Sequence, residues 1–243
     1  MLSDNFRDNF IQRDKLASWQ VVSAFKAYND EFPGGDRFCI ELNNSGALCF
    51  YIADATGHGN YAAELWKCCR DEFDREWQHF LDTPFSQEVL YEFSQTINEI
   101  LYKKKEECNT QLCIAIGSIR DNCLSFANFG YGTHLLVQQD LATWKSPAQE
   151  YSFGLKLGWI NGNAWKNSPR SFVYNEIENV RRIILMTDCF LGNDFENPTQ
   201  TLADIEDMNK HCTALDFEQV IPYFLNTFPC DGDDLSLIVV EAV

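Results

Sequence analysis

No apolar run in this sequence is long enough to cross a membrane as a helix. A membrane-spanning helix needs about 20 apolar residues, whereas the longest apolar run, around residues 235–240, has only the length of a β-strand. Residues 1–15 mix charges throughout and contain no apolar segment of the kind that a secretory signal requires. We therefore expect a cytoplasmic protein with no membrane partner.

Basic residues are also scarce. The chain has 19 Lys and Arg against 36 Asp and Glu, which gives a formal net charge of −17 at pH 7. A surface this negative repels phosphate backbones and anionic lipids, which argues against nucleic acid and membranes as partners. A small partner that binds tightly is then expected to be a cation, or to be held through one.

Linkers, repeats and paired cysteine motifs are missing as well. No Pro-, Gly- or Ser-rich stretch divides the 243 residues, so we predict one domain over residues 19–243, preceded by an arm or short helix over residues 1–18. The ten cysteines include no CxxC pair. Buried free thiols are therefore favoured over a disulfide framework or a zinc site.

Hydrophobic patterning predicts an α+β fold. The turn Asn-Asn-Ser-Gly at residues 43–46 is typical of a hairpin. Strands joined by short turns, and helices grouped in pairs, indicate mainly antiparallel sheets and not a doubly wound parallel fold. Strands are predicted at residues 19–27, 38–42, 47–53, 111–119, 123–128, 134–138, 182–186 and 235–240, and helices at 60–80, 86–105 and 215–228, the last interrupted by Pro222.

Aspartates stand at the ends of four predicted strands. They are Asp36, Asp54, Asp188 and the pair Asp233 and Asp234. A single aspartate in such a place is most simply a turn residue that caps its strand. If the strands lie side by side, however, the carboxylates converge on one edge, and their mutual repulsion then requires a cation between them. An all-oxygen ligand set favours Mg²⁺ or Mn²⁺ over Zn²⁺.

A glycine-flanked loop follows one of these aspartates. Residues 53–59, Ala-Asp-Ala-Thr-Gly-His-Gly, join a predicted strand to a predicted helix. The glycines let the backbone approach a ligand closely, and the first N–H groups of the helix carry partial positive charge. The alternative is an ordinary strand-to-helix turn with His58 on the surface.

Six motifs in one order resemble those of a known family. They are GGD at residues 34–36, ADATGHG at 53–59, ANFG at 127–130, GLKLG at 154–158, TDC at 187–189 and DDLS at 233–236. The order resembles that of the PPM metal-dependent protein phosphatases, in the branch similar to SpoIIE and RsbU. The resemblance implies an α-β-β-α sandwich of two mainly antiparallel sheets flanked by helices.

The same resemblance implies a two-metal centre with two Mn²⁺ or Mg²⁺ ions. Asp54 would bridge the two ions, and the backbone carbonyl of Ala55 would complete one coordination shell. Asp188 and Asp233 would bind the second ion, with Asp36 on its waters or just behind them. Asp36, Asp54 and Asp188 are therefore the expected catalytic residues.

Further residues are expected around this centre. Asp234 stands where relatives often have Asn, and we expect it, together with His58, to lie behind the metal ligands. Gly57 and Arg37 are expected to contact the substrate, Arg37 through its phosphate group. Cys189 stands where relatives usually have Gly, and a small buried residue is the simplest interpretation of it.

The implied activity is that of a metal-dependent protein serine/threonine phosphatase. The metal ions would activate a water for attack on phosphoserine or phosphothreonine, so the lack of a Cys-x5-Arg loop is no objection. The branch implies a phosphorylated STAS-type anti-anti-sigma protein as the substrate, in a partner-switching stress-response pathway. It also implies a regulatory protein that docks on the helices at residues 60–105.

Three other interpretations compete with an active phosphatase. The strongest is a catalytically weak or inactive phosphatase-like module that binds a partner protein, because Cys189 and Arg37 depart from the family pattern. A diguanylate cyclase, suggested by Gly-Gly-Asp-Arg-Phe at residues 34–38, is excluded because only 33 residues precede the motif and Arg replaces its glutamate. A purely structural protein would leave the placement of the aspartates to chance.

Overall fold

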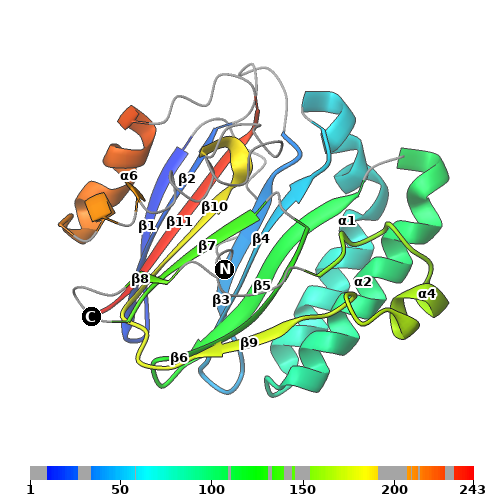
Figure 1. The fold of residues 1–243 in the computed structure, drawn as a ribbon, viewed down its shortest axis with the longest axis horizontal. Helices are drawn as coiled ribbons and strands as arrows, with labels where there is room; N and C mark the ends of the chain where they lie inside the picture. The colour runs from blue at the N-terminus through cyan, green and yellow to red at the C-terminus, as the bar shows by residue number, and fades with distance from the viewer. Residues whose placement is uncertain are drawn as a thin grey trace.

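Two antiparallel sheets form the centre of the structure (Figure 1). The computed structural model describes residues 10–26, 34–57, 59–108, 111–130, 133–139, 144–145, 154–190, 207–208, 210–212, 214–227 and 233–243. The six-stranded sheet has the order β1 (Phe10–Leu16), β2 (Trp19–Lys26), β11 (Leu235–Ala242), β10 (Arg182–Thr187), β7 (Thr133–Gln138) and β8 (Trp144–Lys145). The five-stranded sheet has the order β3 (Arg37–Leu42), β4 (Leu48–Ala55), β5 (Leu112–Arg120), β6 (Cys123–Phe129) and β9 (Tyr174–Ile177).

Helices cover both outer faces of the sheet pair (Figure 1). The long helices α1 (Gly59–Asp82) and α2 (Gln87–Cys108) lie on the five-stranded sheet, with the short α4 (Gly162–Asn167) beside α2. Helix α6 (Phe217–Thr227) packs on the six-stranded sheet. The α+β class and the α-β-β-α arrangement expected from the sequence are confirmed. Among the described helices, none combines the length and the apolar character that a membrane span requires.

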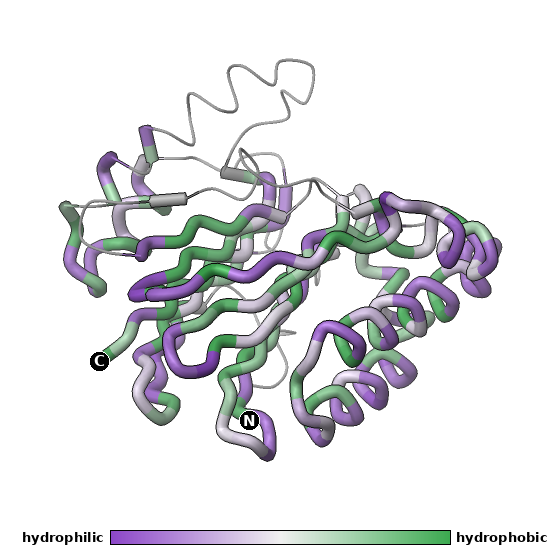
Figure 2. The backbone as a smooth tube through the Cα atoms, turned by 60° about the horizontal axis from the view of Figure 1, so that its bottom comes forward, coloured by the Kyte–Doolittle hydropathy of each residue, from purple (hydrophilic) through white to green (hydrophobic). Residues whose placement is uncertain are grey.

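Three hydrophobic cores separate these layers, because successive side chains of a strand point to opposite faces. In β4, Phe50 and Ile52 belong to the core between the sheets, whereas Tyr51 and Ala53 belong to the core under α1 and α2. A third core joins the six-stranded sheet to α6, with Phe224 at its centre. In Figure 2, hydrophobic and hydrophilic residues alternate along α1 and α2, as expected for helices with one buried face.

The hairpin turn at residues 43–46 is confirmed, and its asparagine explains it. The Asn43 side-chain oxygen accepts hydrogen bonds from the backbone N–H groups of Ser45 (3.0 Å) and Ala47 (2.9 Å). Gly46 adopts a φ of +80°, which a residue with a side chain rarely reaches. The turn closes β3 onto β4 and so fixes their register.

The N-terminal prediction differs from the structure over residues 10–16. These residues form the edge strand β1, which pairs with β2 from Phe10 opposite Phe25 to Leu16 opposite Trp19. The sequence predicts an arm or short helix here because the segment is polar. Charged side chains are common on edge strands, where they discourage pairing with other chains. The division between residues 1–18 and 19–243 otherwise stays a prediction.

Helix α6 also differs from its prediction, because it continues through Pro222. A proline inside a helix removes the hydrogen bond to the carbonyl four residues earlier, which here belongs to Glu218. Glu218 lies in the first turn of α6 and is exposed, so water can replace the lost bond. Meanwhile Val220, Ile221 and Phe224 stay buried against the sheet. Their burial offsets the cost of the proline.

Candidate functional site

Two of the predicted aspartates lie at one end of the five-stranded sheet. Strands β3 and β4 pair antiparallel, so Asp36, before β3, and Asp54, near the end of β4, occupy the same end. Alternation along the strands places Asp36 on the face of Phe38, and Asp54 on the face of Ile52. Both of these apolar residues belong to the core between the sheets. The two carboxylates therefore face the rim of the inter-sheet space.

The other three aspartates lie at strand ends of the six-stranded sheet. Asp188 directly follows β10, and Asp233 and Asp234 directly precede β11, the antiparallel neighbour of β10. The two strand ends are held together where the Ser236 N–H donates to the Thr187 hydroxyl oxygen, at 3.0 Å. All three aspartates are thus placed at one end of this sheet.

Electrostatic interactions show that the aspartates of the two sheets converge. Burial, followed by repulsion from Asp234, raises the pKa of Asp36 well above its ordinary value. Burial and the charges of Asp36 and Asp188 do the same to the pKa of Asp54. Burial and the charge of Asp233 raise the pKa of Asp188 to about 7. The raised pKa values therefore reflect burial and mutual repulsion within a crowded group of carboxylates.

This group fits divalent cations in its donor type and charge. Asp36 is only 6% exposed, and its Oδ2 atom has no hydrogen-bond partner within the part of the chain that the structure describes. A buried carboxylate oxygen of this kind normally has a partner or a bound ion. Among the described residues, no three His, Cys, Asp or Glu side chains are already grouped closely enough to form a metal site. The described carboxylates therefore lie around the rim of the inter-sheet space, but they are not close enough together to coordinate one ion in this arrangement.

The GGD motif is held in place by Asp234. The Gly35 N–H donates to Asp234 Oδ2 at 2.5 Å, and the Gly35 carbonyl accepts from Trp66 Nε1 at 2.6 Å. A Cβ atom at Gly34 would lie 2.2 Å from the Asp234 carboxyl carbon, so the motif needs glycine there. Asp234 thus positions the backbone that leads into Asp36.

The loop after β4 leads from Asp54 to α1. Ala55 N donates to Gly35 O (3.3 Å), which joins this loop to the GGD motif. Gly57 is exposed with a φ of +98°, and a Cβ atom there would approach the Tyr61 ring to 2.9 Å. His58 lies outside the described residues. The glycine is required by the turn, and its expected contact with substrate stays a prediction.

The order of these strand-end motifs corresponds to one protein family. The sequence model of stage II sporulation protein E (SpoIIE) matches residues 44–243, which is most of the chain. The chain belongs to the SpoIIE family. Among curated proteins, none matches the sequence of this chain significantly.

Solved structures agree with this assignment. RsbX, in a crystal structure with magnesium, matches with a TM-score of 0.65 and 13% identity over 96% of this chain and 100% of its own. The SiaA-PP2C domain of Pseudomonas aeruginosa matches with a TM-score of 0.66 and 14% identity, over 92% of this chain and 86% of its own. The PP2C phosphatase domain of SpoIIE from Bacillus subtilis, solved with a fragment of its regulatory domain, matches with a TM-score of 0.64 and 15% identity. The match covers 96% of this chain and 71% of that one.

Family and fold together make this SpoIIE-family chain a homologue of PP2C-type serine/threonine phosphatases, which supports a phosphatase function. The resemblance to the PPM phosphatases is thereby confirmed. The predicted residue roles are not tested by these comparisons. They depend on the geometry of the strand ends described above.

Arg37 is placed differently from its prediction. It lies on the face of β3 opposite to that of Asp36, because neighbouring strand residues point to opposite sides. Its guanidinium pairs with Asp74 of α1 at 2.7 Å and lies over the Trp66 ring, 5.3 Å from the centroid. This position, under the helices, gives no support to the expected contact between Arg37 and the substrate phosphate.

Lys156, within the GLKLG segment (residues 154–158), is a site residue that the sequence interpretation missed. Its Nζ atom donates to the Thr56 hydroxyl at 3.3 Å. Its positive charge lowers the pKa values of both Asp54 and Asp188, opposing the larger effect of burial. The GLKLG motif already identified the segment. The basic residue at its centre was the one signal in the sequence that could have pointed to Lys156 as a site residue.

Cys189 is an exception to the prediction of free thiols, which the eight other described cysteines confirm. It is half-buried directly after Asp188 and forms a disulfide bond whose partner lies outside the described residues. Sequence spacing does not reveal which cysteines meet in space, because disulfide geometry depends on the fold. The described cysteines that are free are Cys39, Cys49, Cys68, Cys69, Cys108, Cys113, Cys123 and Cys212.

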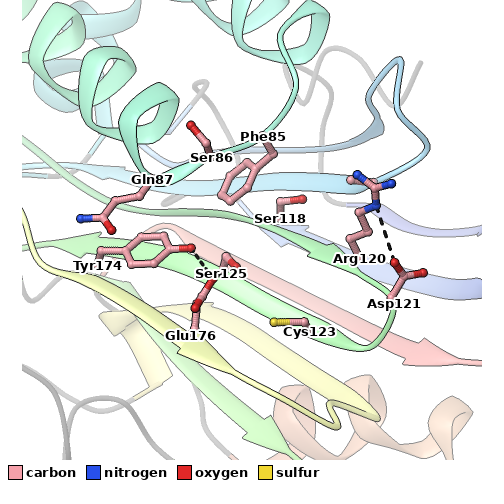
Figure 3. A pocket seen from close by; sticks show the side chains of 11 residues that line it. Phe85, Ser86, Gln87, Ser118, Arg120, Asp121, Cys123, Ser125, Tyr174 and Glu176 are labelled. Carbon is pink, nitrogen blue, oxygen red and sulfur yellow. Dashed lines mark hydrogen bonds and ion pairs between the residues drawn. The ribbon is translucent and has the colours of Figure 1, made fainter.

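A cavity of about 520 Å³ lies at the other end of the five-stranded sheet (Figure 3). The register of β4 and β5 separates it from Asp54 by the length of the sheet. Its lining comes from the loop between α1 and α2 and from β5, β6 and β9, and includes Glu176, which accepts hydrogen bonds from Tyr174 (2.6 Å) and Ser125 (3.2 Å). None of the predicted site residues lines it, so this cavity is separate from the aspartate cluster.

Proposed function

We propose that this chain is a metal-dependent protein serine/threonine phosphatase that uses two Mn²⁺ or Mg²⁺ ions. The convergence of aspartates from both sheets is the observation that best supports the proposal. Their raised pKa values indicate a site with an excess of negative charge, and oxygen ligands favour hard divalent cations. The related RsbX was crystallised with magnesium.

The residue roles follow from the family resemblance and from the strand ends. Asp54 would bridge the ions, with the Ala55 carbonyl completing one coordination shell. Asp188 and Asp233 would hold the second ion, with Asp36 on its waters or behind them. When bound, the ions would lower the pKa of a water and offset charge on the phosphoryl oxygens.

The chain itself would position the reaction. Asp234 fixes the backbone of the GGD motif, so Asp36 enters the site from a rigid loop. His58 is proposed to lie behind the ligands, and Gly57 to let the substrate approach the backbone. Water supplies the oxygen that joins phosphorus, the bond to the serine or threonine oxygen breaks, and that oxygen leaves with a proton. No protein nucleophile is required.

The proposed substrate is a phosphorylated STAS-type regulatory protein in a partner-switching pathway. Two solved structures support this proposal. One contains the RsbU and RsbW domains of Rv1364c from Mycobacterium tuberculosis, with 14% identity and a TM-score of 0.64. The other is a structure from the bacterial stressosome, with a TM-score of 0.57. The exposed surface of α1 and α2 is the proposed docking site for a regulatory protein. Phosphate release from a phosphorylated STAS domain, compared with an unrelated phosphoserine protein, tests this specificity.

A catalytically weak module that binds a partner protein is the second candidate. Two observations favour it. A disulfide-bonded Cys189 directly follows Asp188, and the described carboxylates do not close around one point. In this case the fold would serve recognition without turnover.

Hydrolysis of p-nitrophenyl phosphate, with and without Mn²⁺, separates the two candidates. We expect Mn²⁺-dependent turnover in the wild type and a loss of at least about 100-fold in Asp54→Ala and Asp188→Ala, because each removes a proposed metal ligand. Asp71→Asn, on the exposed face of α1, is the matched control and should keep wild-type activity. No turnover by folded wild type, with either Mn²⁺ or Mg²⁺, would favour the binding module.

A further inference from the structure

The GLKLG segment is fixed to the five-stranded sheet. Leu157 and Leu112 exchange two backbone hydrogen bonds, of 3.0 and 3.2 Å. Gly154 N donates to the carbonyl of Asn128 at 2.8 Å, which ties the start of the segment to β6. Lys156 therefore projects from a backbone that is anchored on both sides of it.

The side chain of Lys156 has a defined path into the site. A Cβ atom at Gly130 would lie 2.8 Å from Lys156 Cγ, so the aliphatic stem passes directly over this glycine. The ammonium group reaches the hydroxyl of Thr56, two residues after Asp54. The half-buried lysine thus extends from the end of the five-stranded sheet toward the aspartate cluster.

The charge of Lys156 acts on aspartates from both sheets. It lowers the pKa values of Asp54, from the five-stranded sheet, and Asp188, from the six-stranded sheet. Lys156, Asp54 and Asp188 are all half-buried, whereas Asp36 is only 6% exposed. The ammonium therefore lies beside the carboxylates of the cluster that remain partly open to solvent.

We propose that Lys156 binds the phosphoryl group of the substrate. The proposal rests on the proposed phosphatase function and replaces Arg37, whose guanidinium pairs with Asp74 on the helix side of the sheet. An ammonium group has three donors, so donors remain for phosphate oxygens beyond the bond to Thr56. It interacts with phosphate as a compact point charge.

The net charge of the chain favours a positively charged residue at the site. The chain carries −17 at pH 7, and a phosphomonoester brings about two further negative charges. Lys156 supplies a positive charge beside the carboxylates that the phosphate has to approach.

The test uses inorganic phosphate as the probe and Lys156→Met as the variant. Methionine keeps an unbranched stem over Gly130 and removes only the charge and its donors. Lys166→Met, exposed on α4, is the matched control. The phosphate-induced rise in melting temperature of the full chain in saturating Mn²⁺ gives the apparent Kd for phosphate, and a Mn²⁺ titration without phosphate gives the metal affinity.

We expect the apparent Kd for phosphate to rise about tenfold or more in Lys156→Met, because a charged hydrogen bond is lost. It should stay at the wild-type value in Lys166→Met, and Mn²⁺ affinity should not weaken in either variant. An unchanged Kd in Lys156→Met would overturn the proposal and leave Lys156 as a counter-ion of Asp54 and Asp188.

The melting-temperature measurement does not depend on turnover, so the two proposals fail separately. Wild type that binds phosphate without hydrolysing p-nitrophenyl phosphate would contradict the phosphatase function alone. Wild type that binds no phosphate at all would contradict the role of Lys156 directly.

Discussion

At the scale of single residues, one step along a strand decides between the site and the core. Asp36 and Arg37 are neighbours in sequence, yet Asp36 faces the inter-sheet space and Arg37 faces α1. The same alternation separates Asp54 from Ala53 in β4. A motif therefore identifies a segment, while the strand register decides which of its side chains can act in chemistry.

Arg37→Ala is predicted to affect stability and not substrate binding. The change removes a partly buried ion pair with Asp74 and a contact with the Trp66 ring, so the free energy of unfolding should fall by about 1–3 kcal/mol. The KM for p-nitrophenyl phosphate should stay unchanged. Urea denaturation and steady-state kinetics provide the two measurements.

Arg75→Ala is the matched control for this prediction. Arg75 is an exposed residue of α1 whose ion pair with Glu76, at 3.5 Å, should contribute little to stability. A raised KM in Arg37→Ala, with stability like that of Arg75→Ala, would contradict the position that the structure gives to Arg37.

The positions of the aspartates could be predicted from the sequence, but those of the basic side chains of Arg37 and Lys156 could not. Asp54 and Asp188 directly adjoin long apolar runs, which locate strand ends even in a single sequence. The orientation of Arg37 depends on where β3 begins, and Lys156 reaches the site only because the GLKLG segment is bonded to the sheet. Such contacts form between segments far apart in the chain, so no local pattern encodes them.

At the scale of elements, α2 supports the site through one buried asparagine. Asn98 accepts a hydrogen bond from Gly158 N and donates one to the Ile160 carbonyl, both at 2.9 Å. These bonds join the helix to the end of the GLKLG segment. A regulator bound to α2 could therefore act on the segment that carries Lys156.

Asn98→Ala is predicted to lower the free energy of unfolding by about 2 kcal/mol or more. The substitution leaves a backbone N–H and a backbone carbonyl without their partner in a buried position. Asn167→Ala, exposed on α4, should change it by no more than about 0.5 kcal/mol. Equal effects of the two substitutions in chemical denaturation would contradict the supporting role of Asn98.

Elements with strong periodicity could be predicted, and short or charged ones could not. Helices α1 and α2 were found because many turns repeat the same apolar face. The four-residue β9 and six-residue α4 are too short to show a period. The charges of β1 conceal its alternation, so pairing with β2, and not its own pattern, makes it a strand.

At the scale of the whole molecule, the stacking of two sheets creates the candidate site. Asp36 and Asp54 come from one sheet, and Asp188 and Asp233 from the ends of strands in the other. The core between the sheets holds these ends against each other although the carboxylates repel. The central claim is that divalent cations relieve this repulsion and drive phosphoester hydrolysis.

The most direct test of this claim is a calorimetric titration of the metal-free chain with Mn²⁺. We predict about two ions bound per chain in the wild type and in Asp71→Asn, as expected for a two-metal hydrolase. In Asp54→Asn, the affinity should fall by at least about tenfold, because the proposed bridging ligand loses its charge. Folded wild type that binds no Mn²⁺, or Asp54→Asn that binds it like the wild type, would contradict the claim.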